Sequence, residues 1–154
     1  MAISQILPAD AYQALKDGSG TIYLDVRTED EFSAGHPEGA FNVPVLFPDP
    51  QGGPPRFNSE FVDLVKALFP AETTILCGCQ SGGRSQRAAE MLSEVGFTQV
   101  MNVQGGFGGA QHPMTGEVVV SGWESEGLPI STEVDGAGSY RVLRCQGGMD
   151  ESSP

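Results

Sequence analysis

The chain of 154 residues is long enough for one domain that buries a core without disulfides or metals to support it. Acidic residues outnumber basic ones by 20 to 8, and the net charge of −12 argues against nucleic acids and anionic membranes as partners. Three cysteines are a poor disulfide framework and the first residues lack a secretory signal pattern, so we expect a cytoplasmic protein.

Strand and helix patterns alternate along the first 103 residues. The strand patterns are short, apolar, β-rich runs, and the helix patterns are bounded by N-caps, glycine or proline. The first five elements are expected as an edge strand at 4–7, a helix at 8–18, a buried strand at 21–26, a helix at 28–35 and a strand at 40–44. The next four are expected as a helix at 58–70, a strand at 73–78, a helix at 84–97 and a strand at 98–103.

The remaining segments carry weaker patterns. Residues 45–57 are rich in proline and glycine and predict a loop without helix or strand. GGFGGA (105–110) predicts the start of a short helix, and HPMTGEVVVSGWESEGLP (112–129) an irregular stretch. Residues 131–154 are polar, acidic and glycine-rich, so we expect a poorly ordered tail after a domain that spans residues 1–130.

The alternation of strands and helices predicts an α/β fold with a parallel sheet and helices on both faces. In such sheets the functional residues gather at the carboxyl ends of the strands. The stretch CGCQSGGRS (77–85) falls at one of these ends, between the strand at 73–78 and the helix at 84–97. This stretch is therefore the candidate site.

The residue types in this loop favour chemistry at a thiolate. The free amides at a helix N-terminus and a nearby cation stabilise an anion, and adjacent glycines let successive N–H groups point inward. Cys79 opens the loop as the candidate nucleophile. The candidate cradle residues that follow it are Gln80, Ser81, Gly82, Gly83, Arg84 and Ser85.

The loop contains no general base, which separates the candidate reactions. Acyl transfer needs a base oriented on the nucleophile, whereas a preformed thiolate attacks sulfur without one. Only four residues lie between Cys79 and Arg84, one fewer than in cysteine phosphatases. This smaller ring favours a sulfur atom over phosphate or arsenate, so a phosphatase or arsenate reductase is the weaker alternative.

The chain resembles a single-domain rhodanese over about residues 3–130. The order and spacing of several segments carry the resemblance: LDVRTEDEF (24–32), GHPEGAFNVP (35–44), CQSGGRSQRAA (79–89), GFTQVMNVQGGF (96–107) and WESEGLP (123–129). The resemblance implies a parallel sheet of about five strands. It also implies a sulfurtransferase that needs no cofactor or metal and moves sulfur from thiosulfate to cyanide or a thiol.

The resemblance assigns roles to individual residues. Cys79 would attack the outer sulfur of thiosulfate, release sulfite and hold a persulfide within the amides of residues 80–85. Asp25 and Arg27 would support the loop. Two segments depart from compact rhodaneses, residues 111–122 and the tail, and they leave a non-catalytic protein-interaction module as an alternative. An intact Cys79 argues against that alternative.

Several residues near these motifs favour structural roles. Cys77 is interpreted as a core thiol, with a disulfide to Cys79 as the less favoured alternative, and His36 as a hydrogen bonder in a turn. Arg84 is interpreted as an anion ligand in preference to a salt-bridge partner. The remaining interpretations are close backbone packing at Gly105 and Gly106, a packing anchor at Trp123, and a solvated helix start at the acidic residues of TEDEF (28–32).

Overall fold

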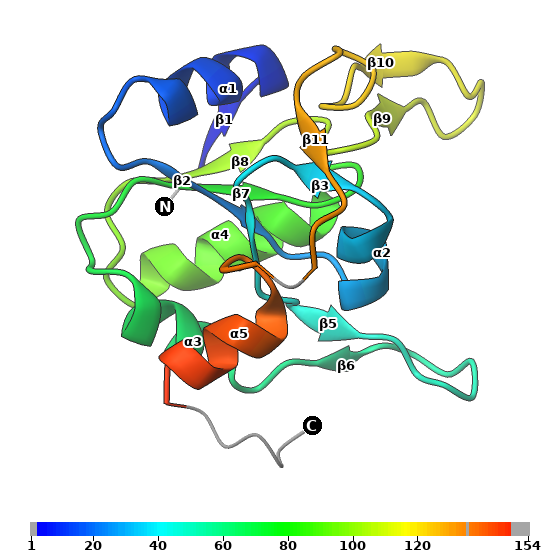
Figure 1. Ribbon diagram of the computed structural model, residues 1–154. Coiled ribbons are helices and arrows are strands. Elements are labelled where there is room, and N and C mark those ends of the chain that lie inside the picture. The colour runs from blue at the N-terminus through cyan, green and yellow to red at the C-terminus, as the bar shows by residue number, and fades with distance from the viewer. Residues whose placement is uncertain (1–2, 135, 149–154) are drawn as a thin grey trace.

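The computed structural model describes residues 3–134 and 136–148. A sheet of five parallel strands forms its centre, in the order β1-β8-β7-β2-β4 (Figure 1). These strands are β1 (Ser4–Ile6), β2 (Ile22–Asp25), β4 (Phe41–Asn42), β7 (Ile75–Gly78) and β8 (Val100–Val103). The predicted α/β class and five-stranded parallel sheet are confirmed.

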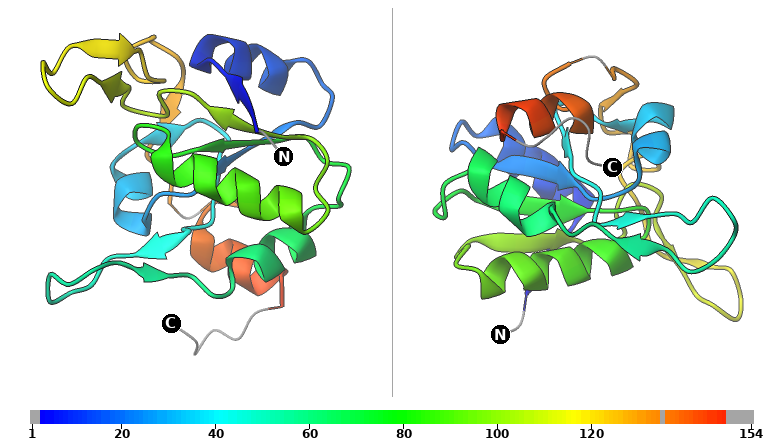
Figure 2. Two further views of the ribbon diagram at one scale, coloured as in Figure 1. Left: turned by 180° about the vertical axis from the view of Figure 1, so that it is seen from behind. Right: turned by 90° about the horizontal axis from the view of Figure 1, so that it is seen from below.

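Helices cover both faces of the sheet, as expected. The helices are α1 (Pro8–Lys16), α2 (Glu29–Ala34), α3 (Phe61–Leu68), α4 (Gly83–Glu94) and α5 (Tyr140–Gln146). Helices α3, α4 and α5 lie on one face of the sheet, and α1 and α2 on the other (Figure 2). Buried side chains of the first three share one core cluster, and those of the other two share a second. Among the described residues, no helix has both the length and the apolar character needed to cross a membrane. The cytoplasmic location stays a prediction.

Every element expected between residues 4 and 103 is present, and most are shorter than the sequence pattern. Capping explains one of the sharper boundaries. The Thr28 hydroxyl accepts a bond from the Glu31 amide, and the Glu31 carboxylate accepts one from the Thr28 amide, so α2 begins with a capping box. The interpretation of Trp123 as a packing anchor is confirmed, because it is 1% exposed and lies edge-on to Tyr12 and Tyr23.

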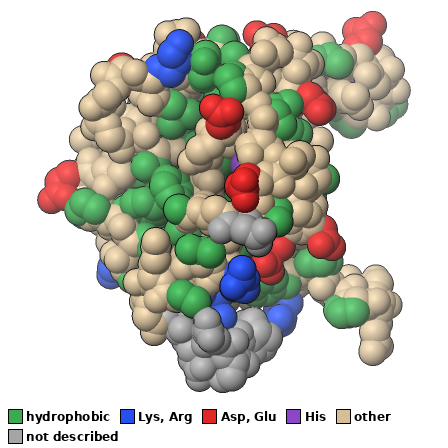
Figure 3. All heavy atoms as spheres, in the orientation of Figure 1, with side chains coloured by type: hydrophobic (Ala, Val, Ile, Leu, Met, Phe, Trp, Pro, Cys, Tyr) green, Lys and Arg blue, Asp and Glu red, His purple; other side chains and the backbone are tan. Residues whose placement is uncertain are grey.

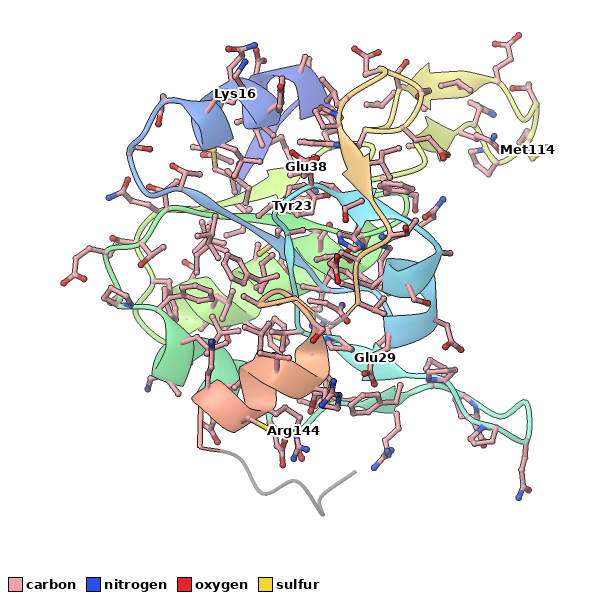
Figure 4. The ribbon with its side chains drawn as sticks, viewed as in Figure 1. Lys16, Tyr23, Glu29, Glu38, Met114 and Arg144 are labelled. Atoms are coloured by element: carbon pink, nitrogen blue, oxygen red, sulfur yellow. The ribbon has the colours of Figure 1, made fainter. Side chains whose placement is uncertain are left out.

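Two predicted loops contain hairpins, which corrects the sequence analysis. Within residues 45–57, β5 (Leu46–Phe47) pairs with β6 (Arg56–Phe57), and the proline- and glycine-rich part connects them. Within residues 110–122, β9 (Ala110–Gln111) pairs with β10 (Val118–Val120), and Met114 lies in the connection, away from the sheet (Figure 4). Strands of two or three residues leave too short a pattern to recognise.

The segment GGFGGA (105–110) forms turns and the start of β9, so the helix predicted to begin there is wrong. Its left-handed glycines place the backbone outside the helical region. Another short pair joins β3 (His36–Pro37) to β11 (Ile130–Ser131). His36 Nδ1 donates to the Phe32 carbonyl oxygen at 2.7 Å, because a carbonyl oxygen only accepts. This bond confirms the interpretation of His36 as a hydrogen bonder, although the residue lies in β3, just before the turn at 38–39.

The C-terminal segment differs from the expected poorly ordered tail. Helix α5 buries Tyr140 and Leu143 in the same cluster as α3 and α4. Arg144 forms an ion pair with Glu60 at 3.1 Å, and the Tyr140 hydroxyl accepts a bond from the Asn58 amide. The apolar residues of YRVL at helical spacing give the physical reason, since they complete the core. The domain boundary at residue 130 stays a prediction, and part of the tail lies outside the described residues.

Candidate active site

The candidate loop lies at the carboxyl end of β7, in the middle of the sheet. Strand β7 runs between β2 and β8 and ends at Gly78, and α4 begins at Gly83. Cys79 to Gly82 therefore form the turn between a central strand and a helix. The loop has the predicted position, and the helix begins one residue earlier than predicted.

Two donors surround the sulfur of Cys79, whose residue is 1% exposed. The Gly82 amide donates to Cys79 Sγ at 3.1 Å, and the Ser85 hydroxyl lies 3.4 Å from the same sulfur. Gly82 has a φ of 116°, a left-handed conformation that favours glycine and turns its N–H toward the sulfur. Three of the predicted site residues thus meet at one atom, in a geometry that stabilises negative charge on sulfur.

The Ser85 hydroxyl is also fixed from the side away from the sulfur. Asn102 Oδ1 lies 2.5 Å from Ser85 Oγ, and the Asn102 amide donates to Gln5 Oε1 at 2.8 Å. Both Ser85 and Asn102 are buried. Asn102 Oδ1 only accepts, and the hydroxyl has a single hydrogen, so Ser85 donates either to Asn102 or, on rotation, to Cys79 Sγ. In both cases Asn102 on β8 lies beside the hydroxyl and positions it next to the cysteine.

A glycine-rich turn holds the loop through its backbone. The Phe107 amide donates to the Cys79 carbonyl at 2.7 Å, and the Gly108 amide donates to the Gln80 carbonyl at 2.8 Å. A Cβ on Gly106 would lie 2.2 Å from the Cys79 carbonyl oxygen, so only glycine fits there. The interpretation of Gly106 as a site of close backbone packing is confirmed.

Arg84 forms an ion pair across the mouth of the loop. Its terminal nitrogens donate to the two carboxylate oxygens of Glu31 at 2.8 and 3.0 Å. Burial opposes the charged form of Glu31, but the bonds from Arg84 and Thr28 outweigh it and lower the Glu31 pKa to about 2. The interpretation of Glu31 as part of a solvated helix start is wrong, and Arg84 does form the salt bridge that the sequence analysis disfavoured. The role of Arg84 as an anion ligand stays a prediction. A guanidinium has five N–H groups, so donors remain on Arg84 for an anion.

A buried ion pair supports the loop from the neighbouring strand. Arg27 contacts the Asp25 carboxylate at 2.8 Å, and both side chains are almost fully buried. Arg27 also donates to the Gly35 carbonyl at 2.7 Å and lies 3.4 Å from Gln80 Oε1. These contacts are consistent with the predicted supporting role of Asp25 and Arg27.

Comparison with known proteins identifies the family. The family model of the rhodanese-like domain matches residues 7–112. The chain belongs to this family. The rhodanese is 40% identical to thiosulfate sulfurtransferase 18 of Arabidopsis thaliana, over 75% of each chain. It is also 40% identical to chloroplastic thiosulfate sulfurtransferase 16 of that plant, over 72% of this chain and 80% of the relative.

The fold comparison agrees with the sequence comparison. The crystal structure of Rv0390 from M. tuberculosis matches this rhodanese with a TM-score of 0.69 and 27% sequence identity. The match covers 86% of this chain and all of that chain. The family resemblance found in the sequence is therefore confirmed.

The other predicted site residues of this chain form no hydrogen bond to the sulfur within the residues that the structure describes. Gln80, Ser81 and Gly83 are exposed along the outer side of the loop. Cys77 lies in β7 and is fully buried, and burial raises the pKa of its thiol, an effect to which the charge of Cys79 adds. The interpretation of Cys77 as a core thiol is confirmed, and the structure has Cys77 and Cys79 as free cysteines.

Two residues of the site escaped the sequence analysis. Glu31 carried a signal, because T-x-x-E at 28–31 is a capping-box pattern, but the pattern does not predict the ion pair with Arg84. Asn102 also carried a signal in the sequence, because it is a polar residue within the apolar strand VMNV. Its partner Ser85 is 17 residues away in sequence, and only the pairing of the β7–α4 unit with β8 brings them together.

Proposed function

We propose that this rhodanese is a sulfurtransferase that moves a sulfur atom from thiosulfate to cyanide or a thiol through a persulfide on Cys79. The environment of Cys79 Sγ carries the proposal, with the Gly82 amide at 3.1 Å and the Ser85 hydroxyl at 3.4 Å. Both donors favour an anionic sulfur. The names of the two Arabidopsis relatives support thiosulfate as the donor.

The first step is attack on a sulfur–sulfur bond. The Cys79 thiolate attacks the outer sulfur of thiosulfate and forms a new S–S bond. The original S–S bond breaks, and its electron pair leaves with sulfite. Charge balances, and no base, oxidant or reductant takes part.

The second step returns the cysteine to its starting state. Cyanide or a thiolate attacks the outer sulfur of the persulfide, and the electron pair of the broken bond remains on Cys79. Until then, the loop amides hold the persulfide anion. Arg84, fixed in direction by its two bonds to Glu31, offers its remaining N–H groups to the sulfonate end of thiosulfate.

Intact mass measurement tests the proposal. After incubation with thiosulfate, we expect the protein to gain one sulfur, about 32 Da, and to lose it on addition of cyanide. Cys79→Ser should show no gain, whereas Cys145→Ser, which removes an exposed cysteine outside the loop, should behave as the wild type. An adduct that persists in Cys79→Ser, or its absence from the wild type, would contradict the proposal.

A further inference from the structure

A pocket opens beside the candidate loop, between α4 and the β5–β6 hairpin. Its volume is about 500 Å³, which lies within the range of roughly 300–1,000 Å³ that is typical of small-molecule sites. The residues that line it are Val45, Leu46, Phe57, Arg84, Arg87 and Met91. Thiosulfate would occupy only a small part of this space, so the pocket accommodates a larger compound.

The lining combines an apolar surface with two cations. The cations are Arg84 and Arg87, and the other four lining residues have apolar side chains. No carboxylate belongs to the lining. Phe57 is 47% exposed, which leaves an aromatic surface available to a ligand. This chemistry is complementary to a compound with an apolar body and a negative group.

The positive charge of the pocket is unusual for this chain. The net charge is −12, and acidic side chains are scattered over the face seen in Figure 3. Arg87 is exposed and forms no ion pair within the residues that the structure describes. Two of the eight basic residues thus meet at one small pocket. The charge of Arg84 is balanced by Glu31, so Arg87 supplies the positive charge that offsets the repulsion of the rest of the chain on anions.

The pocket shares Arg84 with the loop that carries Cys79. The charge of Cys79 contributes to the raised pKa of Arg84, after the larger effect of Glu31. Arg87 and Met91 follow Arg84 at helical spacing and extend the lining along α4. Cys79 itself does not belong to the lining, so a ligand in the pocket has its body along α4 and one end at Arg84, five residues after Cys79 in the same loop.

We propose that this pocket binds the sulfur acceptor, and that the acceptor is a small organic thiol with an apolar chain and a carboxylate or similar negative group. The proposal rests on the proposed function and specifies its acceptor. The thiolate attacks the outer sulfur of the Cys79 persulfide and forms an S–S bond. The bond to Cys79 Sγ breaks and leaves its electron pair on that sulfur, so the product is the persulfide of the acceptor.

Single-turnover transfer from a preloaded protein isolates this step. The persulfide is formed with thiosulfate, excess donor is removed, and the loss of about 32 Da is followed after mixing with a thiol. The probes are 6-mercaptohexanoate, 6-mercaptohexanol and 3-mercaptopropionate. We expect the first to react about tenfold faster than the third at equal subsaturating concentration, because its three additional methylenes are partly buried. We expect it to react about fivefold faster than the neutral alcohol.

Two charge-reversal variants distinguish the effect of a charge in the pocket from the effect of the net charge of the protein on the transfer rate. Arg87→Glu should abolish or invert the preference for 6-mercaptohexanoate over 6-mercaptohexanol, because a carboxylate replaces the cation that faces the ligand. Lys66→Glu makes the same change of charge on α3, outside the pocket lining, and should retain the preference. Phe57→Ala should reduce the advantage of the longer carboxylate over 3-mercaptopropionate.

Equal rates for all three thiols, or a preference that Arg87→Glu leaves intact, would overturn the proposal. The pocket would then fit an acidic and apolar segment of a protein partner better than a small thiol. A wild-type protein that never acquires the sulfur adduct would instead contradict the proposed function. The two failures therefore appear at different stages of the same experiment.

Discussion

Replacing Gly106 with alanine should displace the loop that carries Cys79. The new Cβ would lie 2.2 Å from the Cys79 carbonyl oxygen and 2.9 Å from its carbonyl carbon, whereas ordinary contacts begin at 3.4 Å. The contact with the carbonyl oxygen would thus be about 1.2 Å too short, and the atom in contact belongs to the backbone, which cannot rotate away as a side chain can. Left-handed strain costs about 1–2 kcal/mol and overpacking about 1–3 kcal/mol more, so we expect a total loss of about 2–5 kcal/mol of stability.

The same displacement should slow sulfur transfer more than stability alone explains. A shift of about 1 Å at a reacting group costs on the order of 100-fold in rate. The rate of adduct formation from thiosulfate is measured by intact mass, and stability by urea unfolding. Gly18→Ala is the matched control, because Gly18 has a φ of 78° and no atom within 4 Å of its Cβ position. If Gly106→Ala were no less stable than Gly18→Ala and formed the adduct at the wild-type rate, the reasoning would be refuted.

Three further predictions concern other parts of the molecule. Leu143→Ala should cost about 2–5 kcal/mol in urea unfolding, because it leaves a cavity under α5; unchanged stability would mean that α5 adds nothing to the core. Ser85→Ala should slow adduct formation on Cys79 about fivefold in the intact-mass assay, and an unchanged rate would rule out its donor role. Glu31→Gln should cost about 1 kcal/mol at pH 7, because the ion pair with Arg84 is partly exposed. Since the folded pKa of Glu31 is about 2 and its ordinary value 4.5, this contribution is complete above pH 4.5 and is lost as pH falls toward 2. Urea unfolding of both proteins at several pH values checks this, and a difference that does not shrink in acid would contradict it.

The sequence predicted the central sheet because its strands are buried on both faces and read as continuous apolar runs. TIYLDV and TTILCG are of this kind, and each lies in the middle of the sheet with helices on either side. The candidate loop was equally predictable, since a cysteine, adjacent glycines and an arginine between a strand and a helix specify an anion cradle. Local patterns of this kind need no knowledge of distant partners.

The features of the fold and site that the sequence did not predict depend on contacts between residues far apart in the chain. The ion pair between Arg84 and Glu31 joins residues 53 positions apart, and the turn that contains Gly106 meets the loop only after β8 has paired with β7. Helix α5 was missed for a related reason. Its few apolar residues make a weak pattern within a polar segment, and they stabilise a helix only when packed against α3.

The way the loop is held has a consequence for how freely its sequence can change. Backbone bonds from Phe107 and Gly108 fix the carbonyls of Cys79 and Gln80, and neither bond involves a side chain. The shape of the loop is therefore largely independent of the exposed side chain at Ser81, whereas the Gln80 side chain also contacts Arg27. Natural drift or laboratory selection can alter Ser81, and with it the surface offered to substrates, while the nucleophile keeps its place.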